Sequence, residues 1–103
     1  MPLLLSQNDV VKILDMAECM ESTEKAFAEF ASGTAIQPLR TSFFTPDGLA
    51  VYMPAYLRKT GALACKVVSV YKDPPQKYHM PTTMGTVLLQ DPATGQVVCI
   101  MEG

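Results

Sequence analysis

The sequence predicts an α+β protein, with a short N-terminal strand, two helices and then a largely antiparallel sheet of about five further strands. Two observations predict this fold class. In the first third of the chain, apolar residues recur at the three- and four-residue spacing of one helix side. From residue 39 onward, runs of β-branched, aromatic and aliphatic residues are separated by short turn signals. Short turns favour antiparallel neighbours, because parallel strands need a long crossover.

The N-terminal elements carry recognisable boundary signals. Leucines at 3–5 are long enough for a short strand. Ser6 followed by Asp9 resembles a capping box, which predicts that a first helix begins after Ser6. Asp15 can cap a second helix, and Gly33 can end it, because glycine adopts the left-handed conformation of a helix C-terminus without a steric penalty.

Five strands are expected in the rest of the chain: residues 39–45, 49–56, 62–71, 83–90 and 96–101. Turn signals at 46–48, 58–61 and 91–95 separate most of them. The one longer connection, from Lys72 to Pro81, contains three prolines and is predicted to carry recognition rather than core packing.

Composition limits the function classes. A length of 103 residues predicts a single domain spanning 1–103. Eight basic and ten acidic residues, with no basic stripe, argue against nucleic-acid binding. No apolar stretch is long enough to cross a membrane, and three cysteines without a secretion signal predict a cytoplasmic protein with reduced thiols. An apolar content of 49% with 17% charged residues predicts self-association, as a homo-oligomer such as a dimer.

Motifs for self-contained catalysis are absent from the sequence. There is no GxGxxG or GxxxxGK[ST] loop for a nucleotide, no HExxH and no GxSxG. His79 is the single histidine, so no metal site is expected. Cys65 and Cys99 lie in apolar runs, where cysteine behaves as a small hydrophobic residue. The sequence therefore predicts no metal and no cofactor bound by this chain alone.

Four polar residues stand in otherwise apolar strand contexts. Arg40 lies near the start of one expected strand, Lys66 lies in the middle of another, and Thr82 and Thr83 lie at the start of a third. A lone cation in apolar surroundings is costly unless an anion meets it, so Arg40 and Lys66 on one face would form a clamp for a small acid. Alternation alone favours the other interpretation, in which both cations lie on the solvent side of the sheet.

Seven ordered blocks of sequence resemble the ornithine cyclodeaminase/mu-crystallin family. They are LLLS at 3–6, AFAEFASG at 26–33, QPLRT at 37–41, MPAY at 53–56, KVVSVY at 66–71, TVLLQDPATG at 86–95 and IMEG at 100–103. Each block alone is weak, but their order and spacing across nearly the whole chain are specific.

The resemblance implies which domain of a family protein this chain corresponds to, and which residues form its substrate pocket. Family members are NAD(P)-dependent proteins that act on amino acids or related imines, and the matched part belongs to their substrate-binding and dimerisation domain. By the resemblance, Arg40 grips the substrate carboxylate, Lys66 is the active-site lysine, and Met53 lines the substrate pocket. Thr82 and Thr83 lie at the pocket rim. The implied ligand is a small amino or keto acid.

The sequence also departs from the family pattern. Where the family usually reads Thr-His-Gln-Ala-Thr or Ser-His-Gln-Ala-Thr, Thr83 and Met84 replace the histidine and the glutamine. The family's second carboxylate-binding arginine, its catalytic aspartate and its Rossmann domain would come after Gly103. The resemblance therefore implies NAD(P) for a complete family enzyme and none for this chain alone.

Three hypotheses follow for the function. The first is a stand-alone, non-catalytic substrate and dimerisation domain that self-associates. The second is a binding module for an amino or keto acid, which uses Arg40 and Lys66. The third is half of a split NAD(P)-dependent oxidoreductase or cyclodeaminase that a partner chain completes, with Lys66 then catalytic.

Overall fold

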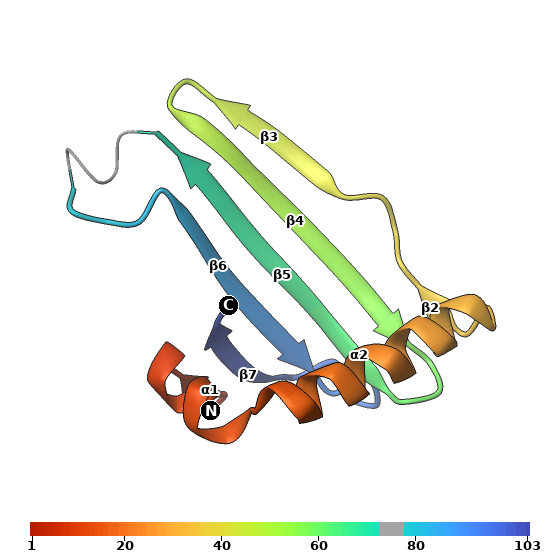
Figure 1. Cartoon of the computed structure of the whole chain (residues 1–103). Helices are drawn as coiled ribbons and strands as arrows, with labels where there is room; N and C mark the ends of the chain where they lie inside the picture. Colours follow the sequence, from red (N-terminus) through yellow and green to blue (C-terminus); the bar gives the residue numbers. More distant parts are fainter. Residues whose placement is uncertain (73–77) are drawn as a thin grey trace.

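The computed structural model describes residues 1–72 and 78–103, and it has the predicted α+β fold (Figure 1). The helices are α1 (Gln7–Ile13) and α2 (Met16–Ala31). The strands are β1 (Leu3–Leu5), β2 (Ala35–Ile36), β3 (Thr41–Thr45), β4 (Gly48–Leu57), β5 (Ala62–Tyr71), β6 (Thr83–Gln90) and β7 (Val97–Glu102). They form one sheet in the order β1-β7-β6-β5-β4-β2, and β3 also pairs with β4.

Both predicted helix starts are confirmed. The Ser6 hydroxyl accepts from the backbone N–H of Asp9 at 3.2 Å, and the Asp9 carboxylate accepts from the backbone N–H of Ser6 at 2.9 Å. These two bonds make the capping box of α1. The Asp15 carboxylate caps α2 by accepting from the N–H of Glu18 at 2.7 Å. Gly33 follows the helix with a φ of 81°, the conformation that glycine tolerates best.

The sheet is antiparallel except at one edge. Strands β3 to β7 pair antiparallel with their sequence neighbours, as the short turns predict, whereas β1 pairs parallel with β7. The two-residue strand β2 was not predicted, because two residues carry no readable period. The expected strand at 39–45 is shorter in the structure and begins at Thr41. Of the connection from Lys72 to Pro81, residues 73–77 lie outside the described residues.

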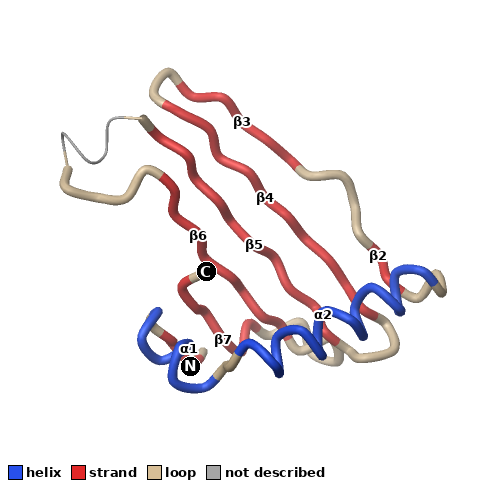
Figure 2. The backbone as a smooth tube through the Cα atoms, in the orientation of Figure 1, coloured by secondary structure: helices blue, strands red, loops and turns tan. Residues whose placement is uncertain are grey.

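The two faces of the sheet differ in their covering. Figure 2 shows α2 crossing the end of the sheet, where its main contacts are with β2 and β4. We call the face that carries Ala55 and Leu57 of β4 the helix face, because both residues line a groove with α2. We call the opposite face, which carries Tyr52, the open face. The described side chains of β4, β5 and β6 are half-buried or exposed on both faces.

Burial is sparse throughout the described part of the chain. There, only Cys99 and Glu29 are buried, with 6% and 5% of their surface exposed. Large apolar side chains on α2 and β3 are exposed, among them Phe27 at 70% and Phe44 at 86%. Neither described helix is long and apolar enough to span a membrane. The sheet therefore offers wide apolar surfaces, which favours further covering by other parts or copies.

Candidate functional site

Lys66 stands in the middle of the helix face, with Met53 beside it. In β4 and β5, Met53 pairs with Lys66, and Lys66 pairs in turn with Val87 of β6. Directly opposed residues of antiparallel strands point to the same face, so all three side chains form one row across the sheet. The Met53 side chain is half-buried and the Lys66 side chain is exposed.

The surroundings of Lys66 are apolar. The alternation of the strands places one charged residue, Lys66, on the helix face of the described strands β4 to β7. Its neighbours there include Val51, Met53, Val68, Val87 and Met101. No described residue forms a hydrogen bond or an ion pair with the Lys66 ammonium. The Lys66 ammonium is therefore free to meet an anion that reaches the helix face.

Arg40 lies one register step from this row. Thr41, the first residue of β3, pairs with Tyr52 of β4, the neighbour of Met53 along that strand, and Arg40 comes directly before this pairing begins. Arg40 itself precedes the strand and is exposed. β4 lies between β3 and β5, so Arg40 precedes a strand that is two strand positions from the strand of Lys66. Two long cationic side chains placed in this way can converge on one small anion.

The structure does not bring Thr82 and Thr83 beside Lys66. Thr82 lies just before β6, where its carbonyl accepts from the backbone N–H of Tyr71 at 2.9 Å. Thr83 pairs with Val70, four residues along the strand from the Lys66 row. It shares the helix face but stands roughly 13 Å away along β6. Both threonines are exposed.

Gly85 occupies the strand between Thr83 and the Lys66 row. A methyl group at Gly85 would meet the Cε atom of Lys66 at 3.6 Å and the carbonyl oxygen of Gly103 at 3.6 Å. The glycine therefore leaves open space beside the lysine stem. Sequence reasoning missed this residue, because a single glycine in a strand does not reveal which side chain leans over it.

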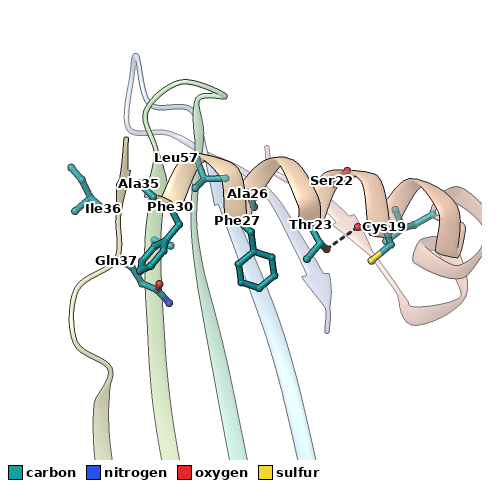
Figure 3. A pocket seen from close by; sticks show the side chains of 12 residues that line it. Cys19, Ser22, Thr23, Ala26, Phe27, Phe30, Ala35, Ile36, Gln37 and Leu57 are labelled. Carbon is teal, nitrogen blue, oxygen red and sulfur yellow. Dashed lines mark hydrogen bonds between the residues drawn. The ribbon is translucent and has the colours of Figure 1, made fainter. Parts of the chain in front are cut away.

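An apolar groove adjoins the row. Its volume is about 660 Å³, and α2 supplies one wall with Phe27 and Phe30, while β4 supplies the other with Ala55 and Leu57. Figure 3 shows the two phenylalanine rings extending from the helix over the strands. Ala55 is two residues from Met53 on the same face of β4, so the groove opens toward the Lys66 row.

A second polar cluster joins α2 to the turn between β4 and β5. The Glu29 carboxylate accepts from the hydroxyl of Thr60 and from the backbone N–H of Lys59. Burial, the largest single influence, raises the pKa of Glu29, but the hydrogen bonds from Thr60 and Lys59 together outweigh it and hold the pKa below its ordinary value. Sequence reasoning missed this cluster, because its parts are thirty residues apart.

The chain belongs to the ornithine cyclodeaminase/mu-crystallin family, whose family model matches residues 1–103. A curated relative, the Delta(1)-pyrroline-2-carboxylate reductase of Bacillus cereus, is 33% identical over 98% of this chain and 31% of its own length. The chain thus spans about a third of that relative. The predicted family resemblance is confirmed.

Solved structures agree. The Delta(1)-pyrroline-2-carboxylate reductase of Thermococcus litoralis, in complex with NADH and L-proline, is 44% identical. The match has a TM-score of 0.91 and covers 98% of this chain and 32% of that one. An archaeal alanine dehydrogenase dimer with bound NAD is 32% identical, with a TM-score of 0.90 over 98% of this chain and 31% of that one. These family members bind a nicotinamide cofactor.

Proposed function

We propose that this chain is the carboxylate-binding, self-associating part of a protein that acts on a small amino, imino or keto acid. One observation carries the proposal: Lys66 is a lone cation in an apolar row, with Met53 beside it and Arg40 one register step away. An arginine fork binds a carboxylate through two parallel hydrogen bonds, and a compact ammonium adds a second charge nearby. Relatives named for pyrroline-carboxylate and alanine support this ligand class.

A nicotinamide cofactor does not fit the residues of this chain. The sequence has no glycine-rich turn between a strand and a helix, the arrangement that holds a pyrophosphate. We therefore assign no hydride step to these 103 residues and expect no nicotinamide-dependent turnover from them alone. In this proposal, Arg40 and Lys66 of this chain bind the carboxylate of the acid, and Met53 forms an apolar contact beside it.

Ligand binding can be tested by thermal shift and by calorimetry. The panel is L-proline, L-alanine, L-ornithine, pyruvate and pyrrole-2-carboxylate, with prolinamide as the probe that lacks the carboxylate. We expect at least one acid to raise the melting temperature, and prolinamide to have no effect. Arg40→Ala should weaken binding by roughly 10- to 100-fold, because a charged hydrogen-bond partner is lost. Lys12→Ala, on α1, is the control.

The rim can be tested with the same panel. Thr83→Ala should change affinity much less than Arg40→Ala, because Thr83 stands four residues along β6 from the Lys66 row. Binding that no acid produces, or that Arg40→Ala leaves intact, would contradict the proposed site.

Self-association is supported by the exposed aromatic residues of the open face. Phe43 of β3 and Tyr52 of β4 form an edge-to-face pair with ring centroids 6.0 Å apart, and both are exposed. In sedimentation experiments we expect a dimer at micromolar concentration, and Phe43→Glu should shift it toward monomer. Phe44→Glu tests the opposite face, since Phe44 pairs with Leu49 and so lies on the helix face, and it should shift the dimer less than Phe43→Glu. A monomeric unmodified chain would contradict this part.

A second candidate function is one half of a catalytic unit, which the incomplete coverage of the relatives favours. The chain can be joined to the part of the Thermococcus litoralis reductase that it does not match. We expect this hybrid to oxidise NADH with Delta(1)-pyrroline-2-carboxylate, and Lys66→Met to remove that activity. A folded hybrid that binds NADH without turnover would count against the second candidate and leave the binding proposal standing.

A further inference from the structure

Glu29 is a buried charge in an unfavourable place. Its side chain is 5% exposed, and no other charged residue that the structure describes is buried. It lies in the last turn of α2, where the helix dipole disfavours a negative charge. The same turn carries no basic residue to offset that charge. A carboxylate at such a site needs partners from outside the helix.

The turn between β4 and β5 supplies those partners. The Glu29 carboxylate accepts from the Thr60 hydroxyl, from the N–H of Lys59 at 2.5 Å and from the N–H of Thr60 at 3.4 Å. Hydrogen bonds to an ionised acceptor are stronger than neutral ones. One side chain of α2 thus satisfies two backbone groups of the turn between β4 and β5.

Arg58 adds hydrogen bonds that run from the β4–β5 turn to the residues just after α2. Its guanidinium donates to the carbonyls of Gly33 at 2.8 Å and Thr34 at 3.2 Å, just beyond the helix end. Its backbone N–H donates to the Thr34 carbonyl at 3.0 Å. The charged groups that face this junction are therefore Arg58 and Lys59 from the turn, and Lys25 from α2, which lines the same hollow as Lys59.

Apolar packing does little to hold this end of α2 against the sheet. Phe27 and Phe30 face the groove between the helix and β4, yet they are 70% and 59% exposed. Side chains that remain this exposed bury little apolar area, and buried apolar area is what usually anchors a helix. Polar contacts hold this end instead: Glu29 bonds to the turn from the helix itself, whereas Arg58 and the β2–β4 pairing hold the residues that follow the helix.

We propose that the Glu29 carboxylate is a latch that fixes the C-terminal half of α2 to the β4–β5 turn and so sets the width of the apolar groove. When the latch is removed, this half of the helix separates from the turn while strands β4 to β7 remain paired. The inference concerns the groove wall and does not depend on whether Arg40 and Lys66 bind an acid.

Hydrogen exchange measured along the whole chain tests the latch. In Glu29→Ala, amides of residues 24–34 should exchange roughly tenfold faster or more, because a charge-assisted junction is lost locally. Amides of β5 and β6 should keep their protection. Thr60→Val, which removes one donor and keeps both backbone N–H groups, should accelerate the same segment by a smaller factor. Glu24→Ala, the same change on the exposed side of α2, is the matched control.

The results that overturn the latch are equally specific. Unchanged exchange at residues 24–34 in Glu29→Ala would show that other contacts hold the helix. Acceleration spread evenly over the helix and β4 to β7 would show a general loss of stability rather than a local release. An equal effect in Glu24→Ala would assign the change to helix propensity. If Glu29→Ala does not fold, Thr60→Val decides by the same criteria.

Discussion

Two charged residues, Glu29 at the end of α2 and Lys66 in the middle of β5, differ in whether the chain itself supplies their partners. Glu29 is 5% exposed and accepts three hydrogen bonds from Lys59 and Thr60. Lys66 is exposed and has no hydrogen-bond or ion-pair partner among the described residues. The carboxylate is satisfied inside the chain, whereas the ammonium is left with apolar neighbours.

The difference suggests a separate role for each charged residue. A buried charge is tolerated when hydrogen-bond partners within the protein satisfy it, and such a charge then holds two elements in one geometry. A charge placed on an apolar face without a partner contributes nothing to folding that a leucine could not contribute. Lys66 lies on an apolar face with no protein partner among the described residues, and the proposed carboxylate site rests on this observation.

The largest effect should come from replacing the satisfied charge. Glu29→Leu leaves the N–H groups of Lys59 and Thr60 without their acceptor near a part-buried site, and unmet donors are costly. We expect the melting temperature to fall by about 5 °C or more, measured by circular dichroism. Glu24→Leu is the control, and it should change the melting temperature much less. Equal melting temperatures for Glu29→Leu and the unmodified chain would show that the hydrogen bonds of Glu29 do not stabilise the fold.

Acid should lower the stability of the fold by protonating the same carboxylate, Glu29. Hydrogen bonds hold the pKa of Glu29 below its ordinary value despite burial, and bonds from Ser6 lower the pKa of Asp9. A lowered folded-state pKa means that the stabilisation is complete above the unfolded value and is lost as pH falls through the folded value. The stability of the unmodified chain should therefore decline below about pH 4.5.

Glu29→Gln isolates the contribution of Glu29 to that decline. Its stability should depend less steeply on pH in the acid range, because a described carboxyl with a lowered pKa no longer titrates. Urea unfolding at a series of pH values measures the slopes. Parallel curves for the two proteins would mean that Glu29 is not held in its ionised form by the fold.

Replacing the unsatisfied charge should have a small effect on stability and a large one on binding. Lys66→Leu should change the free energy of unfolding by less than about 0.5 kcal/mol in either direction, because an exposed lysine without partners contributes little. The same variant should lose the response to the acid that the unmodified chain binds. Urea unfolding and thermal shift measure the two effects. A large loss of stability would show that Lys66 has a structural role.

Much of the fold could be predicted from local patterns. The bounds of β5, Ala62–Tyr71, and the caps Ser6 and Asp15 follow from signals within a few residues of each feature. The strand β2 could not be predicted, because two residues extended beside β4 owe their state to pairing rather than to their own sequence. The parallel pairing of β1 with β7 is likewise a contact between the two ends of the chain.

The candidate site was only partly accessible from sequence. Lys66 and Arg40 could be singled out because cations are rare in strand-like runs, but their alignment depends on the register of β3, β4 and β5. That register also separates Thr83 from the Lys66 row, which the sequence order does not reveal. The burial of Glu29 could not be predicted, because a glutamate in a helix is usually solvated and because its hydrogen-bond partners lie in a turn distant in sequence.

The smallest effect should come from a third kind of charge, one that is exposed and paired. Glu21 and Lys25 form an ion pair at 3.4 Å with side chains 68% and 70% exposed. Their order along α2 is the favourable one, yet solvent screens the attraction, so Glu21→Gln should cost about 0.3 kcal/mol. High salt should erase that difference in urea unfolding, whereas the loss in Glu29→Leu should persist because its bonds are shielded from ions. If salt reduced both losses equally, the Glu29 junction would be an ordinary surface contact, and the contrast with Lys66 would rest on exposure alone.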